Sequence, residues 1–245
     1  MIWLLVLALA LTAGTIGGLI GFGSSIMLMP ALVLAVGPLE AVPMMAIAGL
    51  MANLSRVAVW WREVAWRVAA AFSATAIPAA ALGARTFVAL DAQKLQLALG
   101  LFFLAMIPAR RWLLATGFRI GLPGMAAAGA GIGYLSGLVT AVGPINTPFF
   151  LAYGLVKGPF VSTEAMASAM MGMAKASVFR SFGALPARTL ALGLMVGSAV
   201  TVGSWLSKRL MARIDAASFR LLMDALLLLA ALTMLAGAWP ANPQR

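Results

Sequence analysis

Residues 221–235 read LLMDALLLLAALTML, and this stretch decides the fold class of the chain. It is almost continuously apolar and consists largely of strong helix formers. Strands of a membrane barrel instead alternate apolar and polar residues over about 10 positions. A helix that spans the bilayer needs about 20 mostly apolar residues, and in hydrocarbon only helices and closed barrels satisfy every backbone hydrogen bond. The stretch therefore predicts a transmembrane α-helix.

The whole chain shares this apolar character. Of its 245 residues, 63% are hydrophobic and 9% are charged, and the mean hydropathy is +1.04. A soluble domain has roughly 45–50% apolar and about 25% charged residues. Because a water-soluble fold of this length could not bury so much apolar surface, we expect an all-α polytopic membrane bundle.

The formal net charge is +11, which in a soluble protein would suggest a nucleic-acid partner. Here, however, Lys and Arg cluster in short connections between apolar runs, where they fit topology signals and headgroup contacts. No basic face with interleaved aromatic side chains is present to follow a nucleic-acid backbone. We therefore expect no nucleic-acid partner.

The chain contains no cysteine and no histidine, which excludes disulfides, thiol redox relays and the usual zinc and haem ligands. With only six carboxylates, an intramembrane metalloenzyme is not expected either. The glycine run GLIGFG at 18–23 is not preceded by a strand or followed by GK[ST], so it does not predict a nucleotide site. We predict no enzyme, no cofactor and no metal.

Apolar runs between charges and Pro/Gly breaks predict about eight membrane-spanning helices. Their expected limits are 2–22, 41–60, 66–88, 93–109, 121–142, 162–180, 187–207 and 217–238. Two shorter apolar pieces, 26–36 and 145–156, are interpreted as half-helices or re-entrant segments. The first residues also resemble the apolar part of a signal peptide, but they lack its basic n-region.

The two halves of the chain resemble each other. One shift of 124 positions pairs charged residues in two separate motifs: Glu40 with Glu164, Arg56 with Arg180, and Asp91 with Asp215. We therefore expect a first transmembrane repeat at 1–108, a charged connecting loop at 109–119 and a second repeat at 120–245. Secondary transporters often contain such repeats, with the substrate site near the midplane between them. Whether the repeats are parallel or inverted, and on which side the N-terminus lies, stays open.

The strongest local feature is the glycine-rich segment 14–38, GTIGGLIGFGSSIMLMPALVLAVGP. Each glycine lowers helix stability by about 1 kcal/mol relative to alanine, and proline removes a backbone donor. A helix broken at membrane depth offers free N–H groups and a positive dipole end to an anion. The expected binding loop consists of Gly21, Gly23, Ser24 and Ser25 and ends at Pro30. The alternative is close helix packing through the GxxxG pattern that begins at position 14.

The second half contains an altered copy of this segment at 129–150, GAGIGYLSGLVTAVGPINTPFF. Two prolines four positions apart interrupt a helix there, and the polar side chains between them can bond a solute. The candidate binding residues are Gly143, Pro144, Asn146, Thr147 and Pro148. A loop at the membrane surface is the alternative.

Lys175 is the only basic residue well inside a predicted span. A charge at the bilayer centre costs roughly 2.5–3.5 kcal/mol, so such residues usually face a cavity or a partner. We expect Lys175 to hold an anionic substrate, with snorkelling to the headgroups as the alternative.

Asn53 is a further binding candidate, or else forms an interhelical hydrogen bond. Asp224 could carry a proton, or pair with Arg220 one turn earlier.

The glycine-rich segment ending in Pro30, its altered copy ending in Pro148 and the two helical halves together resemble the sulfite exporter TauE/SafE family of membrane permeases. The resemblance covers essentially the whole chain. It implies an integral inner-membrane protein that exports sulfite, sulfoacetate or related small sulfur-containing anions. It places the family's glycine-rich loop on Gly21, Gly23, Ser24 and Ser25, and its second copy on Gly143 and Pro144. Because the two serines stand where members often have further glycines, the substrate can differ from sulfite.

We therefore expect a multi-pass secondary transporter of the inner cell membrane, whose partners are a small anionic solute and the lipid bilayer. Alternating access would rock the two halves around the site. A membrane scaffold, in which the small residues serve packing alone, and a passive channel are the alternatives. Homo-oligomer formation, the solute, the coupling ion and the direction of transport stay open.

Overall fold

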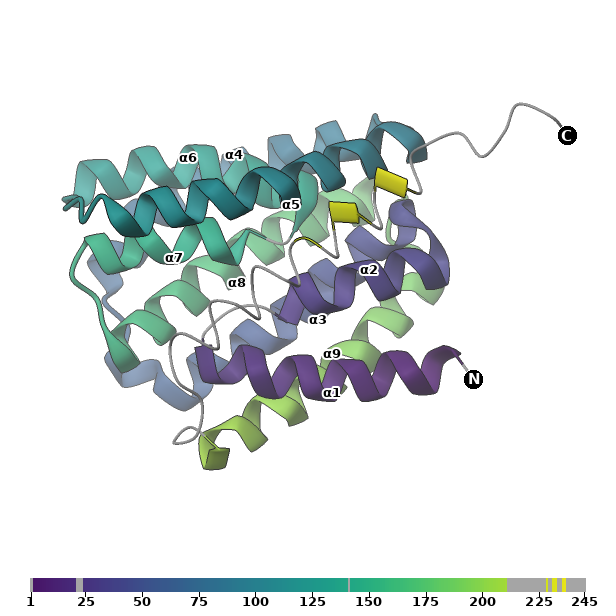
Figure 1. Ribbon diagram of the computed structural model, residues 1–245, viewed down its shortest axis with the longest axis horizontal. Helices are drawn as coiled ribbons and strands as arrows, with labels where there is room; N and C mark the ends of the chain where they lie inside the picture. Colours follow the sequence, from purple (N-terminus) through teal and green to yellow (C-terminus); the bar gives the residue numbers. More distant parts are fainter. Residues whose placement is uncertain are drawn as a thin grey trace, which may run out of the picture.

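The computed structural model describes residues 2–20, 24–140 and 142–210, together with residues 228, 231, 232, 235 and 236. These parts of the chain form helices and no strands (Figure 1). The long helices are α1 (Ile2–Ile20), α3 (Pro38–Trp60), α4 (Trp66–Val88), α5 (Ala92–Ala115), α6 (Leu122–Val139), α8 (Lys157–Ser181) and α9 (Ala187–Leu210). The short elements are α2 (Ser24–Val36), α7 (Gly143–Ala152) and the 3-10 turn η1 (Trp61–Glu63).

The predicted all-α membrane bundle is confirmed. Within the described part of the chain, five helices are long and apolar enough to cross a membrane: α3, α4, α5, α6 and α9. Each of the first seven predicted spans coincides with a long helix, and the two short apolar segments are the short helices α2 and α7. The eighth predicted span, 217–238, lies outside the described residues except for five positions, which are helical.

Helix α5 continues beyond its expected end. The sequence predicts a charged loop at 109–119, whereas α5 runs through Arg110 and Arg111 to Ala115. A helix keeps its backbone hydrogen bonds satisfied as it leaves the hydrocarbon, and the headgroup region tolerates positive charge. These charges therefore mark the membrane surface rather than the end of the helix.

Local sequence explains where two helices begin. Gly37 has a φ of +80°, which residues with a Cβ rarely adopt, and it turns the chain between α2 and α3. Pro38 then occupies the first turn of α3, where its missing N–H is not needed. The Asp91 carboxylate caps α5 by accepting a 2.8 Å hydrogen bond from the Lys94 backbone N–H. Hydrogen bonds from the Lys94 side chain and backbone lower the pKa of Asp91.

Helices α4 and α6 pack backbone to backbone because three glycines line their contact. Gly129, Gly133 and Gly137 recur every fourth residue along α6, and each faces a carbonyl group of α4. The facing carbonyls are those of Phe72, Ala76 and Ala80. A Cβ at any of the three glycines would clash with the opposite backbone, as it would at Gly14 against Val200 of α9. Small residues thus bring helices close, which is how membrane helices associate in lipid.

Contacts across the bundle establish the relative direction of the helices. α4 and α6 are parallel, because their facing residues advance together along both helices. α3 and α8 are antiparallel: Arg56 near the end of α3 lies beside Glu164 near the start of α8, and Leu50 lies beside Gly172. α4 and α8 are parallel, as two contacts near opposite ends show: Ala65 with Thr163, and Phe87 with Phe179.

The two halves of the described chain make the same contacts with opposite chain direction. α1 packs on α9 as α6 packs on α4, and α3 packs on α9 as α8 packs on α4. In Figure 1, α1, α3 and α9 run from right to left, whereas α4, α6 and α8 run from left to right. An inverted repeat produces this arrangement, so the helix directions favour the inverted form of the predicted duplication over the parallel form.

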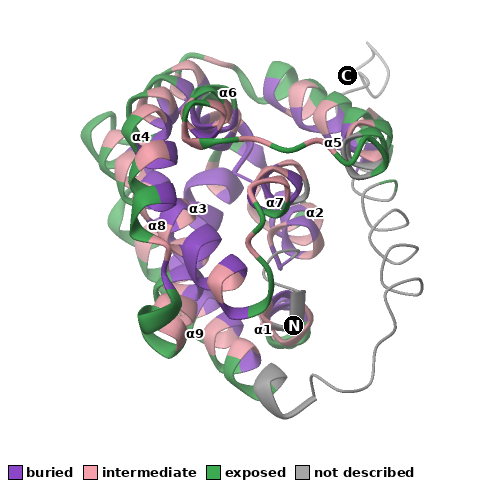
Figure 2. Ribbon diagram, turned by 90° about the vertical axis from the view of Figure 1, so that its left-hand side faces the viewer, coloured by how far each residue is buried: buried purple, intermediate pink, exposed green. Residues whose placement is uncertain are grey.

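Burial separates the centre of the bundle from its outer surface (Figure 2). α3 is buried over much of its length, whereas exposed residues follow the outer sides of the surrounding helices. Large apolar side chains are exposed on that outer surface, among them Leu4, Leu5, Leu34, Leu101 and Trp205. So many large exposed apolar side chains fit hydrocarbon rather than water.

Candidate functional site

A cavity of about 60 Å³ lies inside the bundle, between the first turns of α2 and α7 and the helices α3, α6 and α8. This space accommodates several water molecules, since each needs roughly 10–15 Å³. The polar residues that line it are Ser24, Ser25, Asn53, Arg56, Ser136, Thr140, Glu164, Ser168 and Lys175. The rest of the lining consists of small and apolar residues, including Ile26, Met45 and Val142.

Lys175 reaches this cavity from α8. Its side chain is only 5% exposed, and its Nζ donates to the Ser136 hydroxyl at 3.0 Å and to the Ser136 carbonyl at 3.3 Å. No carboxylate in the described part of the chain forms an ion pair with it. The ammonium group therefore does not snorkel to the headgroups. It brings a positive charge to the cavity without a matching negative one.

A buried ion pair borders another part of the cavity. Arg56 Nη1 lies 3.8 Å from Glu164 Oε2, and the two side chains are 12% and 3% exposed. Arg56 also donates from Nη2 to Oδ1 of Asn53, one turn earlier in α3. About 16 Å of helix separates Glu164 from Lys175, which lies eleven residues further along α8. The two cations thus border different parts of the same cavity.

Glu164 is held firmly through one of its two oxygens. Its Oε1 accepts hydrogen bonds from Asn146 Nδ2 at 2.9 Å and from Ser168 Oγ at 2.8 Å. Its Oε2 is buried without a hydrogen-bond partner, and so is Arg56 Nη1, because 3.8 Å is too long for a hydrogen bond. Thr140 Oγ1, on the same cavity wall, is also unpaired. Unpaired buried polar atoms beside a cavity mark positions where water or a solute binds.

Two helices begin at this cavity and add positive potential. α2 begins with Ser24 and Ser25, and α7 begins with Gly143. The first N–H groups of a helix lack intrahelical partners, and the helix dipole places partial positive charge there. Arg56 and Lys175 also outnumber Glu164 among the lining residues. The described lining is therefore net positive and favours an anion.

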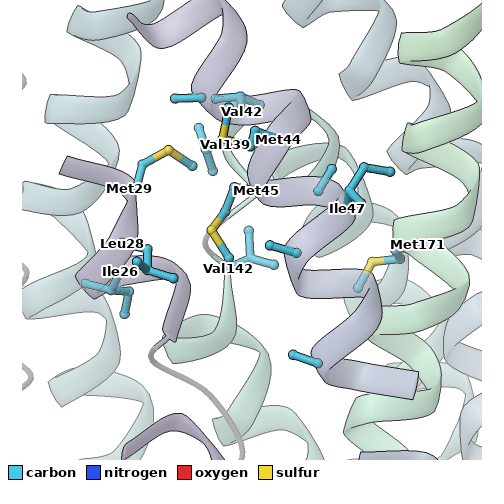
Figure 3. Packing of buried hydrophobic residues seen from close by; sticks show 14 of the residues in the cluster. Ile26, Leu28, Met29, Val42, Met44, Met45, Ile47, Val139, Val142 and Met171 are labelled. Carbon is cyan, nitrogen blue, oxygen red and sulfur yellow. The ribbon is translucent and has the colours of Figure 1, made fainter. Parts of the chain in front are cut away.

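Apolar side chains form part of the cavity lining. Figure 3 shows Met45 of α3 pointing toward Val142, with Ile26 and Leu28 of α2 nearby. Met45, Ile26 and Val142 all line the cavity and are at least nine-tenths buried. An apolar lining lowers the local dielectric constant and so strengthens the electrostatic attraction between the cations and a bound anion.

The structure brings together five of the twelve site residues predicted from the sequence. These are Ser24, Ser25, Asn53, Gly143 and Lys175, all of which line the cavity. Asn146 stands behind the cavity, where it holds Glu164. The hydrogen bond of Asn53 is to Arg56 in the same helix, so the interhelical alternative does not describe it.

The remaining predicted residues lie elsewhere. Thr147 bonds back to the Gly143 carbonyl at 2.9 Å, and Pro30 lies inside α2 away from the cavity lining. Pro148 borders a separate hollow of about 440 Å³ beside residues 117–119. Gly21 and Gly23 lie outside the described residues, as do the side chain of Pro144 and the proton-carrier candidate Asp224.

Sequence reasoning did not select Arg56 or Glu164 as site residues. Arg56 lies four residues before the end of a predicted span, which favours a surface role, and Glu164 served only to mark the repeat. A usable signal was present, because a carboxylate inside a membrane span is by default a candidate for function. The hydroxyl residues Ser136, Thr140 and Ser168 carry no such signal, since serine and threonine are common at helix contacts.

Comparison with models of protein families matches residues 6–234 to the family described as sulfite exporter TauE/SafE. The matched segment includes every residue that lines the cavity. No curated protein and no solved structure matches the chain.

Proposed function

The chain belongs to the sulfite exporter TauE/SafE family, and from this premise we propose that it is a secondary transporter for a small sulfur-containing oxyanion or organosulfonate. As a member of this family it is a multi-pass membrane protein with a transporter role. We assign it to the inner cell membrane, with sulfite and sulfoacetate as the first candidate solutes.

The observation that carries this proposal is the charge of the cavity. Two cations with little exposure, Arg56 and Lys175, and the first turns of two short helices meet around a space whose described lining contains a single carboxylate. An uncompensated positive charge inside a membrane protein is costly unless a ligand supplies the opposite charge. The hydroxyl groups of Ser24, Ser136 and Thr140 are suited to the oxygens of an oxyanion.

The inverted arrangement of the helices supports alternating access. The cavity lies where α3 and α8, the corresponding helices of the two halves, face each other. Rocking of one half against the other would open the cavity first to one side of the membrane and then to the other. In a scaffold the glycine contacts of α4 and α6 would suffice, and a buried lysine that forms no ion pair with the described carboxylates would have no role.

Uptake of radiolabelled sulfite into proteoliposomes tests the site. We expect Lys175→Met to lower uptake about 10- to 100-fold, as the loss of a charged hydrogen bond of about 1.5–3 kcal/mol implies. Ser24→Leu should abolish uptake by filling the cavity. The matched controls are Lys94→Met, whose side chain is exposed, and Ser198→Leu, on an exposed position of α9. Full activity in both test variants would remove these residues from the mechanism.

Two further measurements separate the proposed transporter from its rivals. Counterflow of labelled sulfite against its own gradient is expected of a carrier and not of a passive channel. A saturable rise in melting temperature with sulfite, sulfonates or sulfate is expected of a binding protein and not of a scaffold.

A further inference from the structure

Glu164 is the one carboxylate among the described residues that line the cavity, and anion binding alone gives it no role. A negative charge beside an anion site weakens anion binding. Glu164 is nevertheless firmly placed in the cavity wall, since its side chain is 3% exposed and accepts two hydrogen bonds. We propose that Glu164 is the proton carrier of this transporter: it is ionised in the empty cavity and protonated when the anion is bound. This inference rests on the proposed function, since it assumes that the cavity binds an anion.

The geometry around Arg56 allows a bound anion to replace Glu164 as the partner of the guanidinium. Arg56 Nη1 is unpaired and lies 3.8 Å from Glu164 Oε2, so the guanidinium compensates the carboxylate without a hydrogen bond between these atoms. An anion in the cavity can take Nη1 as its partner and draw the guanidinium away from Glu164. The carboxylate then loses its counter-charge in a buried position, where ionisation is strongly disfavoured. Binding a proton removes that cost.

The hydrogen bonds of Glu164 leave one oxygen for this proton. Oε1 already accepts from Asn146 and Ser168, whereas Oε2 accepts from no group in the described part of the chain. A proton on Oε2 leaves both existing hydrogen bonds intact. It also turns Oε2 into a donor that can face the bound anion. The step makes no covalent change in the anion: Glu164 gains one proton from the water on the side where the anion enters, and releases it to the water on the other side.

The net charge of the cavity also favours uptake of a proton together with a dianion. When Arg56 and Lys175 are both protonated and Glu164 is ionised, the empty cavity carries one net positive charge. A dianion alone would reverse this to one net negative charge, whereas a dianion with one proton on Glu164 leaves the cavity neutral. A monoanion alone already makes the cavity neutral, so charge balance favours proton uptake with a dianion and not with a monoanion. Proton binding with a dianion avoids an uncompensated negative charge at membrane depth.

No other charged group described around α8 competes for this role. Arg56 on α3 and Lys175 on α8 itself are the charged residues that share the cavity with Glu164. The remaining titratable groups on α8 and on the elements packed against it do not line the cavity: Glu40, Arg62, Glu63, Arg67, Arg85, Tyr134, Lys157 and Arg180. Glu63 lies beside Gly158, in the first turn of α8.

Proton counting during binding tests the proposal. Calorimetric titration of purified protein with sulfite, in buffers of different ionisation enthalpy, measures how many protons are taken up per anion. We expect about one more proton per anion in the wild type than in Glu164→Gln, which keeps the shape and the Oε1 hydrogen bonds but cannot titrate. Comparing the two proteins at one pH removes the protons that sulfite itself exchanges. Wild-type affinity should fall as pH rises relative to that of Glu164→Gln.

Glu40→Gln is the matched control. Glu40 occupies the corresponding position in the first half, at the start of α3, and does not line the cavity. This variant should take up protons as the wild type does. Equal proton uptake in the wild type and Glu164→Gln, with binding intact in both, would overturn the coupling role while leaving the proposed transporter in place.

A second measurement needs no variant. Proteoliposomes with equal sulfite concentrations on both sides are given a pH gradient, and the wild type is expected to accumulate labelled sulfite on the alkaline side beyond protein-free liposomes. Counterflow without such accumulation would show a transporter that is not proton-coupled. Absence of both binding and counterflow would contradict the proposed function, and the coupling with it.

Discussion

Arg56 holds two partners and has a free N–H group for a third. It donates to Asn53 in its own helix, compensates Glu164 across the bundle and keeps Nη1 unpaired beside the cavity. The planar guanidinium presents five donors, so one arginine can serve a structural partner and a ligand together. Arg56 is therefore both part of the proposed site and part of what holds α3 to α8.

Removing Arg56 alone should destabilise the protein more than removing the pair. Arg56→Met leaves Glu164 buried without its cation, for which we expect a loss of about 3–5 kcal/mol. The double variant Arg56→Met, Glu164→Gln removes both charges and should regain much of that loss. Thermal unfolding in detergent measures the difference. Arg180→Met is the control, because Arg180 is the corresponding residue of the second half and is exposed.

A double variant no more stable than Arg56→Met would contradict this account of the ion pair. In that case the stabilising role of Arg56 would have to come from its bond to Asn53, and Asn53→Ala would then reproduce the loss.

The sequence predicts some of these residues and not others for a physical reason. Lys175 can be predicted as a site residue because a lone basic residue in an apolar span usually faces a cavity or a partner. The pairing of Arg56 with Glu164 joins positions 108 residues apart, and nothing in either local sequence specifies a partner in the other half. The same holds for Ser136, which becomes a site residue only because α6 places it beside Lys175.

At the scale of elements, glycine spacing decides how α6 meets α4. Gly133 faces the backbone of Ala76, whereas Gly131, two residues away on the same helix, has open space around it. Gly133→Val should therefore force the helices apart and destabilise the protein by about 1–3 kcal/mol or more. Gly131→Val should leave the melting temperature close to the wild-type value. Equal melting temperatures for the two variants would show that the close contact does not stabilise the fold.

Most helices could be predicted from the sequence because hydrocarbon requires long uninterrupted apolar runs. The last turns of α5 could not, since Arg110 and Arg111 stop the apolar run while the helix continues to Ala115. The short helices α2 and α7 follow from the glycines and prolines that precede or interrupt them. Their convergence on one cavity depends on the inverted packing of the halves, which no local pattern specifies.

At the scale of the whole molecule, the helix directions determine which connections share a side of the membrane. The turns after α3, α5 and α7 lie on one side, and those after α2, α4 and α8 lie on the side where α1 begins (Figure 1). In residues 1–210, the first side has eight basic positions near helix ends: Arg62, Arg67, Arg110, Arg111, Arg119, Lys157, Lys208 and Arg209. The second side has four: Arg85, Lys94, Arg180 and Arg188. The positive-inside rule therefore favours a cytoplasmic first side and an outward-facing start of α1.

Cysteine labelling tests this sidedness directly, because the natural chain contains no cysteine. Arg62→Cys and Val156→Cys should be protected from a membrane-impermeant thiol reagent added to intact cells. Ala92→Cys and Ala187→Cys, on exposed positions of the opposite side, should be labelled. The reverse pattern would invert the orientation and leave the fold intact. Mixed labelling within either pair would contradict the helix directions themselves.

With Lys175 protonated, the empty cavity carries a single net positive charge, which would make the proposed carrier sensitive to membrane voltage. If the cavity crosses loaded with a dianion and a proton, it carries no net charge, whereas the empty cavity returns with one positive charge. An elementary charge that crosses 100 mV gains or loses about 2.3 kcal/mol. An inside-negative potential therefore draws the empty carrier toward the cytoplasmic side, where it meets the anions of the cell. The resting voltage of the membrane would thus bias this protein toward export.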